Sequence, residues 1–163
     1  TLILLAKMQG RSQKGRQAGR ELVSRWFADA NTDEAELDRI VDALQAGFKK
    51  ILAVLGSGRL VLTDHPQARG STLASSEAFV FTAREPVDVV YEDAFFSANN
   101  VLKGLKNWTR ILAHELSHRE LATVDKFYAW QGIKPVSGFP AADALVNAES
   151  WAFFCADAAG ALQ

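Results

Sequence analysis

Apolar residues recur at helical spacing in two long stretches of the first third of the chain. Residues 13–28 and 34–55 place apolar side chains at every third or fourth position, which is typical of amphipathic helices. Segment 31–34 supplies a capping side chain and acidic residues ahead of the second helix, and the glycines of 56–58 end it. The side chains expected to be buried are Ala18, Leu22, Val23, Trp26 and Phe27 in the first helix and Leu37, Ile40, Val41, Leu44, Phe48, Ile51, Leu52 and Leu55 in the second.

Short alternating segments follow and predict three strands, over 59–63, 78–82 and 87–91. Helical spacing returns over 102–121 and again from 141 to the end of the chain. The stripes of these two helices consist of Leu102, Leu105, Trp108, Ile111, Leu112 and Leu116 in the first and Leu145, Ala148, Ala152, Cys155 and Ala159 in the second. The order of elements predicts an α+β fold with N-terminal helices, a small sheet and two further helices.

The segments 64–71 and 131–140 are rich in glycine, proline and polar residues and are expected to be loops. His65 follows Asp64 in the first of them, and several serines lie nearby. No nucleophile-elbow motif accompanies them, so we interpret His65 as a loop residue and not as part of a Ser-His-Asp site.

Composition narrows the class of protein. The 163 residues are 48% apolar and 23% charged with a net charge of −1, which predicts one globular domain over 1–163 and no nucleic-acid partner. Basic residues do gather before Trp26, but without interleaved aromatic residues they are typical of a solvated helix face. The longest apolar runs, such as 2–6 and 51–55, are too short to span a membrane. Cys155 is the only cysteine, which excludes an internal disulfide. Because the chain begins at Thr1, we expect a domain excised from a longer protein.

The chemistry of the chain concentrates in the run His114-Glu115-Leu116-Ser117-His118. On a helix, positions 114 and 118 share one face a turn apart, so both imidazoles can bind one cation. Glu115 is displaced by about 100° around the helix, where it can meet a water at the metal without binding the metal itself. This arrangement of two ligands and a general base is the H-E-x-x-H motif of zinc peptidases.

A catalytic zinc ion takes three protein ligands, and no histidine follows His118, so the third ligand is expected to be a carboxylate. The position of the third ligand remains open at this point. The carboxylates that follow the motif are Glu120, Asp125, Asp143, Glu149 and Asp157.

Three motifs together resemble the aspzincin metallopeptidases, the family of deuterolysins and peptidyl-lysine metalloendopeptidases. After the H-E-x-x-H run, the family has a G-T-x-D-x-x-Y element, which is similar to Ala122–Tyr128 here. An N-A-[DE]-S-[YW] helix follows, similar to Asn147–Phe154. Residues 87–91 and the pair Phe95-Phe96 also resemble the segment that leads into the metal helix of the family.

The resemblance implies a zincin-like fold and a zinc-dependent endopeptidase with one zinc ion per chain and a protein or peptide as substrate. It implies that His114, His118 and Asp125 bind zinc and that Glu115 is the general base. Tyr128 would donate a hydrogen bond to the developing oxyanion.

The resemblance also places Glu149 near the pocket for the residue after the cleaved bond, where acidic groups receive lysine in the lysine-specific members. The chain departs from the family pattern at Ala122, where the family has glycine, and the link from His118 to Asp125 is short.

Two alternatives stay open. In the first alternative, Glu149 is the third zinc ligand, in a thermolysin-like arrangement. In the second, the domain is a non-catalytic binding or effector module on a peptidase scaffold. The intact general base Glu115 argues against the second alternative. A toxin or effector domain of a larger secreted protein, acting outside the producing cell, also fits the sequence.

Overall fold

Most of the residues that the structure describes are helical, and three short strands form a small sheet beside the helices. The computed structural model describes residues 1–8, 12–63, 77–83, 85–91, 102, 104–128 and 139–162. The helices are α1 (Leu2–Met8), α2 (Gln13–Phe27), α3 (Glu34–Leu55), α5 (Leu105–Leu121), α6 (Ala141–Val146) and α7 (Ala148–Ala158). The strands are β1 (Leu60–Thr63), β2 (Ala78–Val80) and β3 (Val87–Tyr91). The predicted order of elements is confirmed in its coarse form.

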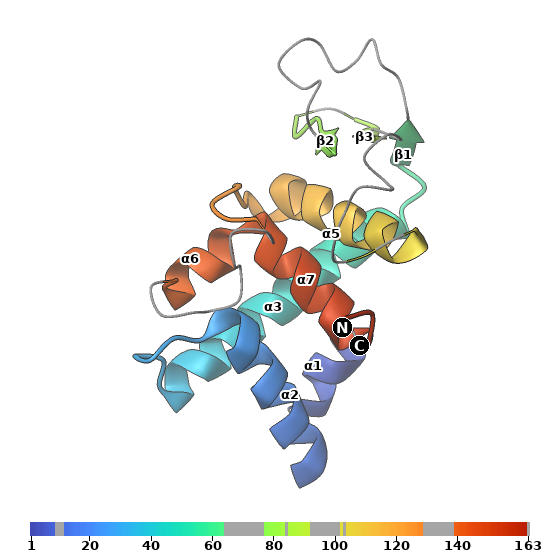
Figure 1. The fold of residues 1–163 in the computed structure, drawn as a ribbon. Coiled ribbons are helices and arrows are strands. Elements are labelled where there is room, and N and C mark those ends of the chain that lie inside the picture. The colour runs from blue at the N-terminus through green and yellow to red at the C-terminus, as the bar shows by residue number, and fades with distance from the viewer. Residues whose placement is uncertain are drawn as a thin grey trace.

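Helix α7 lies at the centre of the molecule. In Figure 1 it crosses in front of α3, with α5 on one side of it and α1 and α2 on the other. Aromatic side chains of α7 pack against aromatic side chains of α2 and α3. Burial of these large rings is the main source of stabilisation for such a helix. The ring contacts join Trp26 to Phe153, Phe27 to Trp151 and Phe154, and Phe48 to Trp151 and Phe154.

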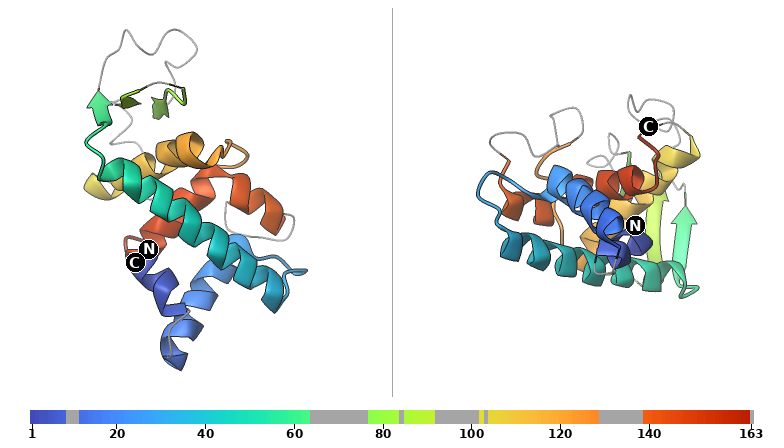
Figure 2. Two further views of the ribbon diagram at one scale, coloured as in Figure 1. Left: turned by 180° about the vertical axis from the view of Figure 1, so that it is seen from behind. Right: turned by 90° about the horizontal axis from the view of Figure 1, so that it is seen from below.

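Helix α3 runs along the back of the molecule (Figure 2), and the ring of Trp151 on α7 packs directly against it. A Cβ atom at Gly47 would lie 2.5 Å from the ring of Trp151, so only glycine permits this separation of the two helices. The helix begins as predicted, with the side chain of Asp33 accepting a hydrogen bond from the backbone N–H of Glu36 at 2.8 Å.

Three expectations about the buried faces of α2 and α3 are wrong. Ala18 is exposed, and Gly19 is buried instead because Met8 of α1 packs against it. Leu52 and Leu55 are exposed although they share the apolar spacing of α3, since the helix contributes Ile51 and Val54 to the core instead. The apolar stripe of α3 is therefore wider than the face that its neighbours cover.

The small sheet packs against α5 on the side away from α7 (Figure 1). Its strand order is β1-β3-β2, with β1 parallel and β2 antiparallel to β3. Arg119 of α5 donates a hydrogen bond to the carbonyl oxygen of Thr82 at 2.6 Å and pairs with Glu85, which holds the turn between β2 and β3 to the helix.

Helix α5 starts later than its apolar spacing predicts. Gly104 has a φ of 57°, in the left-handed region that glycine tolerates, and the helix begins at the next residue. Leu105 is 82% exposed, so it does not belong to the buried stripe, whereas Leu102 before the turn is buried.

The C-terminal segment is two helices instead of the single predicted one. Asn147 separates α6 from α7 with extended backbone angles and forms a bridge of parallel type with Val124. Cys155 is half-buried, and its sulfur lies 3.3 Å from the Thr1 hydroxyl. The break at Asn147 brings the chain after α5 against the start of α7.

Some predictions lie outside the described residues: the loop at 64–71 with His65, the segment containing Phe95 and Phe96, and residues 131–138 of the later loop. Among the residues that are described, no helix combines the length and apolar character needed to span a membrane.

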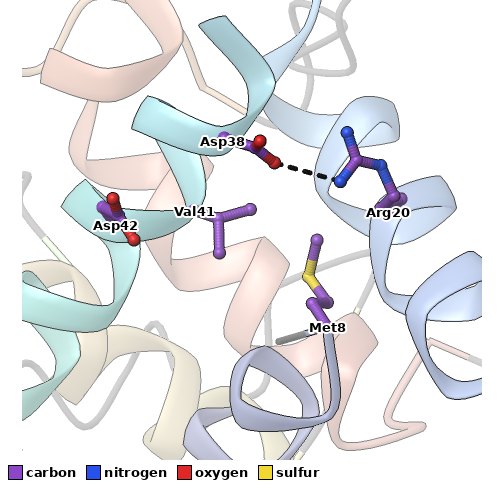
Figure 3. A pocket seen from close by; sticks show the side chains of 5 residues that line it. All are labelled: Met8, Arg20, Asp38, Val41 and Asp42. Atoms are coloured by element: carbon purple, nitrogen blue, oxygen red, sulfur yellow. Dashed lines mark hydrogen bonds and ion pairs between the residues drawn. The ribbon is translucent and has the colours of Figure 1, made fainter. Parts of the chain in front are cut away.

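A cavity of about 380 Å³ lies among the N-terminal helices. Figure 3 shows its lining residues, Met8 of α1, Arg20 of α2 and Asp38, Val41 and Asp42 of α3. Arg20 pairs with Asp38 at 3.0 Å and also with Glu34, so its charge is neutralised within the protein. None of these residues belongs to the site described next.

Candidate metal centre

Two turns of α5 and the segment that follows it bring three metal-binding side chains together. His114 and His118 lie one turn apart on α5, as their spacing predicts. The helix ends at Ala122, whose φ of 55° turns the chain into the left-handed conformation. The chain then runs back beside the start of α7, with the backbone N–H of Val124 donating to the carbonyl of Val146 at 2.8 Å. This reversal places Asp125 next to the two imidazoles.

Three donor atoms converge there. The Nε2 atoms of His114 and His118 are 3.1 Å apart. Oδ1 of Asp125 lies 3.0 Å from Nε2 of His114 and 3.3 Å from Nε2 of His118. Ligand atoms of these three residues all lie within 4.8 Å of one another. The described part of the chain therefore offers a compact set of two nitrogens and one oxygen.

This set fits a zinc ion. Zinc prefers tetrahedral sites with nitrogen and oxygen ligands at about 2.0–2.2 Å, so two ligands of one ion are separated by roughly 3.3–3.5 Å. The separations of the three donor atoms, 3.0–3.3 Å, are close to that value. Three protein ligands leave the fourth position of a tetrahedral ion for water or substrate.

Hydrogen bonds at the other ring nitrogens aim both histidines at this point. Nδ1 of His118 lies 2.8 Å from the carbonyl oxygen of Thr123, which can only accept, so Nδ1 carries the proton. The neutral ring then presents the lone pair of Nε2. Thr123 is itself fixed by a 2.7 Å hydrogen bond between its hydroxyl and that of Ser117. Nδ1 of His114 lies 2.9 Å from Oε2 of Glu149.

Asn147 holds the segment that carries Asp125, a role that sequence reasoning missed. Its side chain is fully buried, and Oδ1 accepts hydrogen bonds from the backbone N–H groups of Lys126 and Phe127 at 3.0 and 3.1 Å. Its amide donates to the hydroxyl of Ser150 at 3.0 Å. The N-A-E-S motif contained a signal, since asparagine before a helix commonly organises a turn, but its partners lie 21 and 20 residues earlier in the chain.

Glu115 lies beside the donor set on the same helix. It is buried, and burial raises the pKa of its carboxyl against the opposing charges of His114 and His118. A carboxyl with a raised pKa is closer to the range in which it exchanges protons at neutral pH.

The side chains of the donor set shift one another's pKa values, so that the two histidines bind protons more tightly and Asp125 stays ionised. Burial alone would lower the pKa of His114, but hydrogen bonds to Asp125 and Glu149 outweigh it and raise that pKa to about 10. The pKa of His118 is also raised, by Asp125, against burial. Burial opposes the shift at Asp125, whose pKa the two histidines nevertheless hold well below its usual range. A cation at this point would meet the negative charge of Asp125 and displace protons from the two imidazoles.

Tyr128 lies against the same cluster. Its ring stacks on that of His114 with a centroid separation of 6.4 Å, and its hydroxyl donates to Asp125. Burial and this hydrogen bond raise the pKa of the phenol, so Tyr128 is a hydrogen-bond donor at neutral pH.

Glu149 has different neighbours from those that the sequence led us to expect. Its side chain is 2% exposed and pairs with Arg110 at 2.7 Å as well as with Nδ1 of His114. Nδ1 is the ring nitrogen opposite to the one that faces Asp125, so Glu149 does not join the donor set as a third ligand. Its carboxylate is also bound by an internal arginine, Arg110 of α5.

Comparison with known proteins agrees with this geometry. The family described as lysine-specific metallo-endopeptidase, the aspzincins, matches residues 12–156 of the chain. No curated protein matches the sequence closely. Because the family match covers most of the chain and the donor set contains an aspartate, the thermolysin-like alternative with Glu149 is wrong. The chain belongs to the aspzincin family of zinc metallo-endopeptidases.

Proposed function

We propose that this protein is a zinc endopeptidase that hydrolyses peptide bonds with Glu115 as general base and Tyr128 as oxyanion donor. The observation that carries the proposal is the convergence of His114, His118 and Asp125, with Glu115 between the two histidines in the sequence of one helix. Membership of the aspzincin family supports it and implies a protein or peptide as substrate.

His114 and His118 through Nε2, and Asp125 through Oδ1, would hold the ion. Zinc bound there supplies a Lewis acid that polarises the scissile carbonyl and lowers the pKa of water. The hydrogen bonds to Thr123 and Glu149 keep the two rings turned toward the ion.

Glu115 accepts a proton from the attacking water and returns it to the leaving amine. The position next to His114 suits this role because the carboxylate is close to the donor set without belonging to it. Its burial leaves few competing water molecules to hold the proton.

Tyr128 donates a hydrogen bond to the carbonyl oxygen as that oxygen gains negative charge. The phenol interacts with Asp125 of the donor set, so the group already lies at the site.

The edge of the small sheet offers a place for an extended peptide. β2 pairs with β3 along one side, and no described strand pairs with its other side. An extended substrate can bind to such an edge by main-chain hydrogen bonds. The contact between Glu77, just before β2, and Arg110 of α5 keeps this edge beside the metal helix.

Cleavage-site mapping by mass spectrometry tests the proposal. The zinc-loaded protein is incubated with a mixture of unfolded proteins, with and without a zinc chelator. Cuts that disappear with the chelator are expected. Glu115→Gln should lower the turnover number by about 10²- to 10⁴-fold and leave zinc binding intact, because only the proton acceptor is lost.

Glu120→Gln is the matched control, since Glu120 lies on the same helix but outside the donor set and is expected to leave cleavage unchanged. Near-normal cleavage by Glu115→Gln would rule out this mechanism. A zinc-loaded protein without any cleavage activity would favour the non-catalytic binding module.

A further inference from the structure

We propose that Glu149 is a positioning residue for His114, held in place by Arg110, and that it does not receive a substrate lysine. The inference rests on the proposed zinc site but concerns residues outside the ligand set. It changes the role that the family resemblance implied for Glu149.

The contacts of Glu149 connect it to the metal site from behind. Its Oε2 atom lies 2.9 Å from Nδ1 of His114 and 2.7 Å from Nη1 of Arg110. A carboxylate that accepts the Nδ1 proton of a metal-binding histidine fixes the ring orientation and makes Nε2 a stronger ligand. Glu149 therefore acts on the ion through His114.

Arg110 is fixed from several sides, so it presents one geometry to Glu149. The side chain is 3% exposed, and Nε donates to Oδ1 of Asn107 at 2.9 Å. Nη2 pairs with Glu77. The guanidinium also lies over the ring of Phe153, 5.4 Å from its centroid. Phe153 follows Glu149 by one turn of α7, so one face of that helix binds the arginine through both a carboxylate and a ring.

Charge argues against a lysine at Glu149. A buried carboxylate binds a cation strongly only when its own charge is not already compensated, and Arg110 compensates it within the protein. A substrate ammonium would have to displace an arginine that Glu77, Asn107 and Phe153 also hold. The internal arginine thus occupies the place of a substrate cation.

The arrangement also connects the sheet to the ion. Glu77 stands just before β2 and accepts hydrogen bonds from Arg110 and from the amide of Asn107, the latter at 3.1 Å. A continuous series of contacts runs from Glu77 through Arg110 and Glu149 to His114.

Zinc affinity, measured by competition with a chromophoric chelator, tests the proposal without relying on activity. Glu149→Gln should bind zinc about 10- to 100-fold more weakly than the parent protein, as is typical when such a partner of a ligand is lost. The cobalt-substituted variant should show an altered d–d absorption spectrum. If Glu149→Gln alone is too unstable, the double variant Arg110→Met/Glu149→Gln replaces it. This variant also removes the buried arginine, whose charge would otherwise lose part of its compensation, and it should show the same loss of zinc affinity.

Asp157→Asn is the matched control. Asp157 is another buried carboxylate of α7, paired with Arg25 at 3.0 Å and with the indole of Trp26 at 2.8 Å. Within the described part of the chain, no hydrogen bond or ion pair joins it to His114. Its loss should lower stability but leave zinc affinity and the cobalt spectrum unchanged.

Unchanged zinc affinity in both Glu149 variants, with a parent protein that binds zinc and cleaves substrate, overturns this inference and leaves the proposed function standing. A selective loss of cuts before lysine in Glu149→Gln, with normal zinc affinity, also overturns it. A parent protein that binds no zinc overturns the proposed function and this inference together.

Discussion

The side chain of Asn147 supports the donor set by joining elements that are far apart in the sequence. Asn147 ends α6, begins α7 and fixes the segment after α5 through two backbone N–H groups. Thr123 supports His118 locally, since its backbone carbonyl oxygen lies 2.8 Å from Nδ1 of that ring. The donor set is therefore only as well ordered as these uncharged partners make it.

Asn147→Ala should both destabilise the protein and weaken zinc binding. Two backbone N–H groups lose their acceptor, which costs about 1–3 kcal/mol for groups withdrawn from water. Because those groups follow Asp125 directly, the carboxylate also loses its fixed position. Urea unfolding and zinc titration measure the two effects. Asn147→Asp keeps an oxygen acceptor and should retain more of both, whereas unchanged zinc affinity in Asn147→Ala would show that Asp125 is positioned independently.

At the level of elements, the end of α5 decides where Asp125 lies. Ala122 adopts φ 55° and ψ 34° there, a conformation that costs residues with a Cβ atom roughly 1–2 kcal/mol relative to the right-handed one. The family pattern has glycine at this position. The chain accepts the cost because the left-handed residue is what turns it back toward the imidazoles.

Ala122→Gly should raise the stability of the protein. Relief of the left-handed conformation outweighs the larger backbone entropy that glycine loses on folding, for a net gain of about 0.5–1 kcal/mol. Thermal unfolding checks this in the presence and absence of zinc. Ala113→Gly, in the middle of the same helix at a right-handed position, should instead destabilise the protein. A lower unfolding temperature for Ala122→Gly would contradict the argument.

At the level of the whole molecule, zinc and protons compete for one cluster. Hydrogen bonds to carboxylates raise the pKa of His114 to about 10 and raise that of His118 in the metal-free protein, despite the opposing effect of burial. The stabilisation from a protonated His114 is complete below its unfolded pKa of 6.5 and is lost as the pH rises toward about 10. Zinc binds only the neutral imidazole, so the stabilisation that zinc provides increases as the pH rises.

Zinc binding should therefore release protons at pH 7, and zinc affinity should increase with pH. Calorimetric titration in buffers of different ionisation enthalpy measures the number of protons released. Zinc at 100 times its dissociation constant should also stabilise the fold by about 2.7 kcal/mol, because it binds the native state. His118→Ala removes a ligand and should show neither effect. Binding heats that do not depend on the buffer would contradict the proton count.

The local features of this protein follow from its amino-acid sequence alone, because they depend on contacts between residues close in the chain. The helical spacing of α2 and α3 and the cap at Asp33 depend on neighbouring residues, and the structure has these elements close to their predicted bounds. The interval of one turn between His114 and His118 likewise follows from helix geometry alone. The resemblance of three motifs to the aspzincins was carried by residues that are visible without a structure, and the family match confirms it.

Contacts between residues far apart in the chain depend on packing and could not be predicted from local patterns. Periodicity shows that a residue is apolar but not which neighbour covers it, so Leu52, Leu55 and Leu105 were assigned to buried faces and are exposed. The partner of Glu149 could not be found from its own motif, because Arg110 lies 39 residues earlier on another helix. The two carboxylates Asp125 and Glu149 were rivals as zinc ligands in the sequence, and packing separated them by bringing one to Nε2 and the other to Nδ1 of the same ring.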